Sequence, residues 1–213
     1  MTQDNSGLWK FDEGLGLFTS LCGIDEAGRG PLAGPVCAGC VMLREGVDLP
    51  TLNDSKKLTE KRREALYDEL TEGDACLGYG IGFGTVAEID TMNILRATFI
   101  AMRRAYENML ERDPELKAPV LALVDGNQDP HLPIETKLVV GGDAKSAHIA
   151  AASIIAKVSR DRVMRAYADM YPDYHFEKHK GYGTKEHYAL LREHGPSPIH
   201  RMSFLKKLYP EGT

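Results

Sequence analysis

The sequence has few cysteines, few aromatic residues and no long hydrophobic run, and these shortages exclude several classes of protein. The cysteines show no pattern typical of a disulfide-stapled secreted domain: Cys22, Cys37, Cys40 and Cys76. No run approaches the ~18 apolar residues that a membrane-spanning helix needs. The first residues, MTQDNSGLWKFDEG, lack the basic-then-apolar layout of a signal peptide. We therefore expect a cytoplasmic protein that does not enter a membrane.

One CxxC pair, Cys37 and Cys40, lies inside an apolar run and has no second pair to complete a zinc site. Buried free thiols are one interpretation, and a zinc or redox role is the other. The chain has 213 residues, 43% of them hydrophobic, so it can bury a core and is not globally disordered. We expect an N-terminal arm over residues 1–16, loosely held, and a single domain over residues 17–213.

The formal net charge of -5 argues at first against a nucleic-acid partner, but the charge is unevenly distributed. Residues 144–213 contain 12 Lys and Arg against 7 Asp and Glu, whereas residues 1–143 contain 14 and 24. This asymmetry permits a basic face beside an acidic cluster. A solvated basic tail explains the same numbers.

Hydrophobic periodicity and turn residues predict a mixed sheet with helices on its faces. Apolar runs predict three early strands in an antiparallel meander, and two later strands each end in an acid or in glycines. Helical spacing predicts helices between and after the strands, the longest of them rich in alanine. The predicted strands are Phe18–Ile24, Val36–Leu43, Cys76–Phe83, Pro119–Val124 and Leu138–Val140; the predicted helices are Thr59–Leu70 with Thr59 as its cap, Ile94–Leu110, Ala144–Met170, Lys185–Glu193 and Phe204–Leu208.

Four acids follow the ends of the inner strands or come just before the long helix: Asp25, Glu26, Asp125 and Asp143. Ligand sites of open sheets gather at such strand ends, so we expect the four carboxylates to share one pocket. Glu26 points away from Asp25 if the strand continues, so it needs a turn at Ala27-Gly28 to re-aim it. Converging carboxylates repel one another, and hard divalent cations with oxygen ligands relieve that repulsion, which favours Mg²⁺ or Mn²⁺.

Each of these acids also has an ordinary structural explanation. Asp125 with Gly126 is a common turn pair, and Asp143 is placed to cap the helix that follows it. Glu26 fits a solvated loop. Asp25 is harder to explain in this way, because an unpaired acid in an apolar setting is costly.

The stretch GIDEAGRGPLAGPV places a glycine-rich turn directly after the first two acids. Its spacing matches neither a Walker A loop nor a dinucleotide-binding fingerprint. Gly28, Arg29 and Gly30 instead expose main-chain groups that a ligand can approach; a tight turn with no further role is the alternative.

Two basic stretches are candidates for binding a nucleic acid. DSKKLTEKRR carries Lys56 and Lys57, and HKGYGTKEH places Tyr182 between two glycines among cations and histidines. An exposed aromatic ring there is a platform for a base or sugar, although packing explains a single tyrosine equally simply. His175 and His179 are interpreted as polar surface residues.

The chain resembles bacterial ribonuclease HII. The resemblance lies in GIDEAGRGPLAGPV, LNDSKKLTEKRR, ALVDGN, VVGGDAKSAHIAAASIIAKVSRDR and HKGYGTKEHYALLREHGPSPIHRMSF, which occur in this order over residues 23–204. It implies a ribonuclease H-like α/β fold, with a mixed five-stranded sheet flanked by helices and with C-terminal helices. It also implies a monomeric two-metal endonuclease that uses Mg²⁺ or Mn²⁺.

The implied substrates are RNA/DNA hybrids and duplex DNA with embedded ribonucleotides, cut 5′ of the ribonucleotide to leave a 3′-hydroxyl and a 5′-phosphate. By the resemblance, Asp25, Glu26, Asp125 and Asp143 are the catalytic metal ligands. Gly28, Arg29 and Gly30 form the glycine-basic-glycine motif, and Tyr182 senses the junction. Lys56 and Lys57 are assigned to phosphates.

Two rival hypotheses remain on the sequence alone. One is a metal-dependent nuclease of the same fold with another substrate, such as a structure-specific DNA endonuclease. The other is a hybrid-binding module without catalysis, which would require the loss of an acid, and all four are present.

Overall fold

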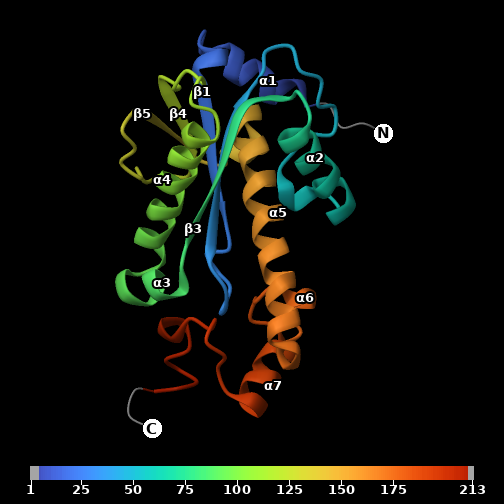
Figure 1. Ribbon diagram of the computed structural model, residues 1–213, viewed down its shortest axis with the longest axis vertical. Coiled ribbons are helices and arrows are strands. Elements are labelled where there is room, and N and C mark those ends of the chain that lie inside the picture. Colours follow the sequence, from blue (N-terminus) through green and yellow to red (C-terminus); the bar gives the residue numbers. More distant parts are fainter. Residues whose placement is uncertain (1–4, 211–213) are drawn as a thin grey trace.

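A five-stranded sheet with a long helix against each face forms the body of the computed structural model, which describes residues 5–210 (Figure 1). The strand order is β3-β2-β1-β4-β5. The first three strands of the chain pair antiparallel, and β4 and β5 run parallel to β1, which confirms the predicted mixed sheet. The strands are β1 (Leu21–Ala27), β2 (Val36–Leu43), β3 (Cys76–Gly84), β4 (Leu121–Asp125) and β5 (Glu135–Val139).

Seven α-helices are found in the described residues: α1 (Ser6–Glu13), α2 (Glu60–Glu72), α3 (Val86–Met92), α4 (Ile94–Arg112), α5 (Ala147–Met170), α6 (Phe176–His179) and α7 (Lys185–His194). Thr59 caps α2 as predicted, since its side chain accepts a hydrogen bond from Arg62 N. The helix predicted at 204–208 is wrong: a short 3-10 turn spans Met202–Phe204 instead. None of the helices within residues 5–210 has the length and apolarity needed to cross a membrane.

Close contact between α5 and the sheet depends on small residues on both partners. A side chain at Gly23 or Gly39 would collide with the α5 backbone, because a methyl group there would lie 2.1 Å from His148 C or 2.5 Å from Ala152 O. The alanines of α5 face this surface without bulk, and they form a core with residues of α1, α2, β2 and the segment between β2 and α2. The alanine-rich pattern of the sequence thus sets how closely the long helix lies on β1 and β2.

Helix α4 covers the opposite face in the same way (Figure 1). Methyl groups at Gly80 and Gly82 would each lie 2.1 Å from an α4 carbonyl oxygen. A second core therefore fills the space between α4 and the strands, and it contains Cys22 and Cys40. All four cysteines are free, and Cys22, Cys37 and Cys40 are buried, so the interpretation of CxxC as buried thiols is confirmed.

The N-terminal segment is not the loose arm that the sequence suggests. Residues 1–4 lie outside the described residues, but α1 packs on the start of α5. Oδ2 of the fully buried Asp12 accepts hydrogen bonds from the main-chain N of His148 at 3.0 Å and from its Nδ1 at 2.8 Å. Asp12 therefore caps the first turn of α5 from a distant part of the chain, and its negative charge lies where the helix dipole favours it.

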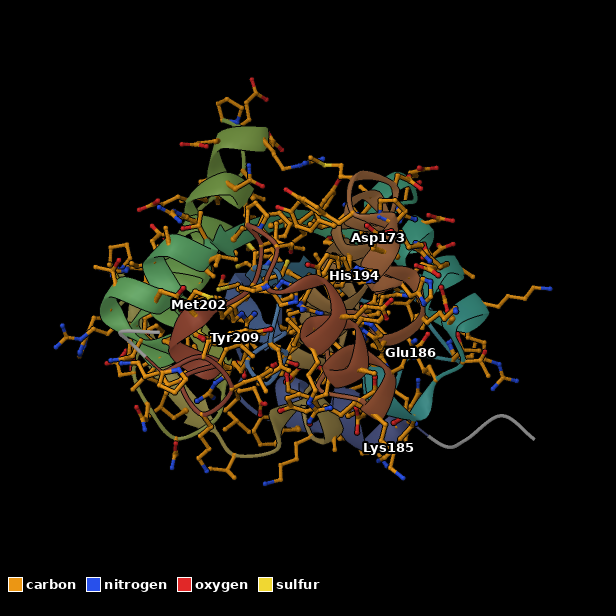
Figure 2. The ribbon with its side chains drawn as sticks, turned by 90° about the horizontal axis from the view of Figure 1, so that it is seen from below. Asp173, Lys185, Glu186, His194, Met202 and Tyr209 are labelled. Carbon is orange, nitrogen blue, oxygen red and sulfur yellow. The ribbon has the colours of Figure 1, made fainter. Side chains whose placement is uncertain are left out.

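The C-terminal segment lies at the end of the molecule opposite the N-terminus (Figure 1). Figure 2 looks onto this end, where the segment carrying Lys185, Glu186 and His194 lies in front of the sheet. A third core, built on Phe176, Leu191 and Leu205, joins it to the C-terminal half of α5. The C-terminal helices thus pack on α5 and lie across the loop that follows β1.

The Asp12–His148 contact generates a stability prediction. Asp12→Ala removes the distant cap and leaves two buried donors unpaired, so we expect a loss of roughly 1–3 kcal/mol in the free energy of unfolding. Urea denaturation measures this loss. Glu13→Ala is the matched control, because Glu13 is exposed on the same helix. Equal stability of the two variants would show that α1 does not support α5 through Asp12.

Candidate active site

Asp25 lies near the end of the central strand β1 and is 5% exposed. Its Cα partner on β2 is Gly39, which faces α5, so Asp25 lies on the α5 side of the sheet. Its Oδ1 accepts a hydrogen bond from the main-chain N of Glu26 at 2.7 Å. Burial raises the pKa of Asp25 well above its ordinary value, and the charges of Glu26 and Asp125 raise this pKa further.

Glu26 lies on the other face of the same strand. It lines a cavity of about 50 Å³ together with Asp125 and with Thr98 and Met102 of α4. The turn expected to re-aim it is absent, because β1 continues through Ala27. Burial raises the pKa of Glu26; Arg29, whose Nη1 lies 3.5 Å from Oε1 of Glu26, opposes that shift, and the charge of Asp125 adds to it.

Asp125 is the last residue of β4, next to β1. Its Oδ1 accepts a hydrogen bond from Gly142 N at 2.7 Å, which ties the strand end to the turn after β5. Burial raises its pKa, and the hydrogen bond from Gly142 lowers it in part. Gly126 has a φ of 108°, so the turn expected at this pair begins directly after the acid.

Asp143 lies in a 3-10 turn (Gly142–Ala144) before α5 and is 6% exposed. It does not cap α5, because Ser146 does so through its hydroxyl group, which accepts from Ile149 N at 3.2 Å. Oδ2 of Asp143 is 3.2 Å from Nζ of Lys56. Partial burial lowers the pKa of Lys56, but the charge of Asp143, the hydrogen bond to it and the charge of Asp25 together raise this pKa above its ordinary value, so Lys56 is a counterion of the acids.

The four carboxylates meet at one edge of the sheet but do not form the single pocket expected from the sequence. Asp25 leaves β1 on the α5 side, and Glu26 leaves it on the α4 side. Within residues 5–210, no three acidic, histidine or cysteine side chains converge closely enough to hold a metal ion. Their charges still act on one another, since Asp25 responds to the other three. An all-carboxylate donor set, in which the pKa values of Asp25, Glu26 and Asp125 are raised, fits a hard divalent cation in its chemistry.

The turn after β1 is held by a buried arginine, Arg201, which is 0% exposed. Its guanidinium donates to four main-chain carbonyl groups: Gly28 at 2.7 Å, Arg29 at 3.0 Å, Pro31 at 2.8 Å and Gly34 at 2.8 Å. No carboxylate in the described part of the chain forms an ion pair with it. Burial lowers its pKa to about 9, so it remains a cation at neutral pH.

A second buried arginine, Arg160 of α5, joins this turn to the loop that carries Tyr182. It donates to the carbonyl groups of Ala33, Pro35 and Lys180 at 3.0–3.1 Å. Its guanidinium carbon lies 5.9 Å from the centre of the Tyr182 ring. The turn and the tyrosine loop are therefore parts of one bonded unit.

Gly28 and Gly30 differ in the space that the fold leaves for a side chain. Gly28 has a φ of 96°, and a methyl group there would lie 1.9 Å from Nε of Arg160, so the fold requires glycine at this position. A methyl group at Gly30 would meet only Cε1 of Tyr182, at 3.8 Å, which is ordinary contact. The fold therefore leaves open space at Gly30 beside a tyrosine that is 44% exposed.

Sequence reasoning placed Asp25, Glu26, Asp125, Asp143, Lys56 and Tyr182 close to one another, and the structure brings them to one end of the sheet. Lys57 is exposed and has no contact that assigns it a role. The sequence patterns do not reveal Arg160 and Arg201. Their only signal is their place in SRDR and IHRMS, both within the stretches of resemblance. The prediction that His179 is a surface residue is wrong, since it is 8% exposed.

Comparison with known proteins agrees with this arrangement. The family model described as Ribonuclease HII matches residues 22–207. Ribonuclease HII of Desulfitobacterium hafniense (strain DSM 10664 / DCB-2) is 49% identical over 204 residues, which are 96% of this chain and 74% of that protein. Ribonuclease HII of Endomicrobium trichonymphae is 52% identical over 188 residues, which are 88% of this chain and 86% of that protein.

Comparison with a solved structure supports the same fold. The PCNA:RNase HII complex from Archaeoglobus fulgidus contains a chain that is 25% identical, with a TM-score of 0.66, and the match covers 86% of this chain and 94% of that chain. The expected ribonuclease H-like fold, with its mixed sheet and flanking helices, is thereby confirmed.

The electrostatics of Asp25 generate a prediction with a definite sign. Because its pKa is raised on folding, its ionisation destabilises the folded chain as the pH rises above about 4. Asp25→Asn should therefore melt at an equal or higher temperature than wild type at pH 7 in EDTA, and the difference should shrink toward pH 4. Thermal melts at both values test this, with the exposed Asp169→Asn as control. A large loss of stability at both pH values would indicate a structural role for Asp25.

The two glycines generate a paired prediction. Gly28→Ala should lower the free energy of unfolding by roughly 1–3 kcal/mol, because its methyl group displaces Arg160 and its φ is unfavourable for alanine. Gly30→Ala should change stability by less than about 0.5 kcal/mol. Urea denaturation of both variants gives the comparison. A reversed order would contradict the assignment of Gly30 as open space.

Proposed function

The chain belongs to the ribonuclease HII family, and on that premise we propose that it cuts duplex DNA on the 5′ side of an embedded ribonucleotide. Membership supports a ribonuclease H hydrolase acting as an endonuclease. The finer proposal adds hydrolysis of the RNA strand in RNA/DNA hybrids, dependence on Mg²⁺ or Mn²⁺, and products with a 3′-hydroxyl and a 5′-phosphate. Such an activity serves ribonucleotide removal in DNA replication and repair.

One observation carries the proposal: the acids lead directly into a turn whose open position adjoins an exposed tyrosine. Asp25 and Glu26 lie near the end of β1, Gly30 follows four residues after Glu26, and Tyr182 lies beside Gly30. A scissile phosphate at the acids therefore places the adjoining sugars against the turn and the ring. The 2′-hydroxyl group is what separates RNA from DNA at a given site, and such a turn can read it.

The acids are proposed to hold two divalent ions, which when bound would activate water for attack on phosphorus and neutralise the leaving 3′ oxygen. Asp25 approaches this place from the α5 side and Asp143 from the turn before α5, while Glu26 and Asp125 line the cavity beside α4. The raised pKa values of Asp25, Glu26 and Asp125 favour the capture of cations over the retention of bare charge. Substrate and ions together would draw the carboxylates inward.

Recognition is assigned to the turn and the tyrosine. Main-chain groups of Gly28, Arg29 and Gly30 would contact the 2′-hydroxyl group, because Gly30 places no side chain in the way. The ring of Tyr182 would stack on the next sugar, where a second 2′-hydroxyl group would collide. This arrangement favours a ribonucleotide followed by a deoxyribonucleotide.

The cations near the acids are proposed to hold phosphate groups. Lys56 is well placed, since its Nζ lies at the acids while its side chain is 79% exposed. Lys57 is assigned beside it on position alone. Such contacts give register on the duplex and no base specificity. A cytoplasmic location and a monomeric state also stay proposals.

The experiment compares three duplexes that differ only in sugar: one embedded ribonucleotide, an RNA/DNA hybrid and all DNA. We expect wild type to cut the first on the 5′ side of the ribonucleotide and to leave all DNA intact, with Mg²⁺ or Mn²⁺. Asp125→Asn should abolish cutting. Tyr182→Ala should lower kcat/KM on the single ribonucleotide by roughly 5- to 150-fold, the range for a lost stacking contact.

Tyr182→Phe is the matched control, because it keeps the ring and removes only the hydroxyl group; it should retain most of the activity. Mn²⁺ affinity should survive in both tyrosine variants. Equal cutting of all DNA would favour the rival hypothesis of a nuclease with another substrate. Equal activity of Tyr182→Ala and wild type on the single ribonucleotide would refute junction sensing by this residue.

A further inference from the structure

Three histidines lie buried beneath the loop that carries Tyr182, and none of them belongs to the acid cluster. His187 is 0% exposed, His200 is 2% exposed and His179 is 8% exposed. Their rings pack together, with the His179 and His187 rings stacked at 4.3 Å between centroids. Buried histidines that the chemistry does not use call for another explanation.

A chain of hydrogen bonds runs from Ser197 through two of these rings to the main chain of Tyr182. Ser197 N donates to Nδ1 of His200 at 2.9 Å. Nε2 of His200 lies 2.9 Å from Nε2 of His187. Nδ1 of His187 lies 2.9 Å from the carbonyl oxygen of Tyr182. The chain thus ends on the residue that carries the exposed ring.

The position of each proton in this chain follows from its two ends. A carbonyl oxygen only accepts, so His187 carries its proton on Nδ1 and its Nε2 is an acceptor. His200 must therefore carry its proton on Nε2, which leaves its Nδ1 free to accept from Ser197. Both rings are neutral in this arrangement, and a second proton on either would remove an acceptor that the chain needs.

The surroundings of the rings favour the neutral state. Phe176 lies 5.7 Å from His187 and 5.6 Å from His200, and Tyr174 lies 5.0 Å from His200, between ring centroids. No carboxylate of residues 5–210 forms an ion pair with either ring. Burial lowers the pKa of both His187 and His200 to about 4.

The loop itself needs such support. Lys180 has a φ of 49° and Gly181 a φ of 82°, and non-glycine residues adopt positive φ only where their surroundings hold them. The Gly181 carbonyl accepts from Leu32 N at 2.8 Å, which ties the loop to the turn after β1. His187 bonds the next carbonyl group, that of Tyr182, which also accepts from Thr184 N at 2.8 Å. Two successive carbonyl groups of the loop are therefore fixed, and the ring projects from between them.

We propose that His187 and His200 are positioning residues that hold Tyr182 against Gly30 through this ordered chain of neutral imidazoles, and so set the preference for a ribonucleotide–deoxyribonucleotide junction. The inference rests on the proposed function, since it deepens the role of Tyr182. Neither histidine touches the substrate. Their effect reaches it only through the orientation of the tyrosine.

The first measurement is independent of activity. Long-range ¹H–¹⁵N correlation spectra of ¹⁵N-histidine-labelled protein at pH 7 report which nitrogen of each ring carries the proton. We expect the Nδ1–H form for His187 and the Nε2–H form for His200. Either ring in the opposite tautomer, or charged, would overturn the chain.

The second measurement is the ratio of kcat/KM on the single-ribonucleotide duplex to kcat/KM on the RNA/DNA hybrid. His187→Phe keeps the ring and loses the bond to Tyr182, so the ratio should fall about tenfold, as for one lost hydrogen bond. His187→Asn keeps a donor near the Nδ1 position and should retain the ratio within about threefold. His175→Asn is the control, because His175 is half-buried on the same segment, pairs with Glu186 and lies outside the chain. Mn²⁺ affinity should be unchanged in all three variants.

A double-mutant cycle separates positioning from general support of the fold. In the Tyr182→Ala background, His187→Phe should cause no further fall in the ratio, because the residue it positions is gone. Additive falls, or an unchanged ratio in His187→Phe alone, would overturn the proposal and leave the proposed function standing. An unchanged ratio in Tyr182→Ala alone would instead overturn the role of Tyr182 itself, and this inference with it.

Discussion

Two buried guanidinium groups bonded to main-chain carbonyl oxygens hold in place the turn after β1 and the tyrosine loop, the two segments to which recognition is assigned in the proposed function. Arg160 and Arg201 together bond seven carbonyl groups, six of them in the turn after β1 and one, that of Lys180, in the tyrosine loop. Burying a charge is costly unless it is hydrogen-bonded, and each bond from a charged donor contributes about 1.5–3 kcal/mol. The carbonyl groups of a glycine-rich turn lack regular partners of their own. The arginines and the turn therefore satisfy each other.

The acid side of the site is held by a different balance. Because side chains alternate along a strand, those of Asp25 and Glu26 lie on opposite faces of β1. The carboxylates are therefore close to one another near the end of the strand but do not share one face of the sheet. Lys56 and Arg29 offset part of their repulsion, each by an ion pair with one acid. Ammonium and guanidinium groups on flexible, exposed side chains are easily displaced, which suits the proposed binding of divalent ions and a phosphate group at the acids.

Much of this architecture could be predicted from the sequence, because its signals are local. The threonine cap of α2, the buried strand β2 and the alanine-rich α5 each follow from residues within one element. Asp25, Glu26 and Asp125 could be found because they lie at or near the ends of strands, and Asp143 because it directly precedes the long helix. Arg201 could not, since it bonds the carbonyl group of Arg29, 172 positions away. The same holds for Asp12, whose partner His148 is 136 positions away. A buried charge paired with main-chain carbonyl groups leaves no complementary residue in the sequence for a pattern to detect.

The two sides of the site therefore differ in when their order is established. The turn and the tyrosine loop are bonded to each other before any substrate arrives, through Arg160 and the hydrogen bond from Leu32 N to Gly181, and the histidine chain bonds the loop to Ser197. The carboxylates lie near one another without converging, and their mutual repulsion opposes closer approach. A preorganised turn and loop would lose little conformational freedom on binding, so the binding energy of their contacts could discriminate between sugars. On the proposed function, the acids would gain their final order only with the ions and the phosphate. A duplex that does not fit the turn would then fail to bring its phosphate to the acids, so selection would precede chemistry.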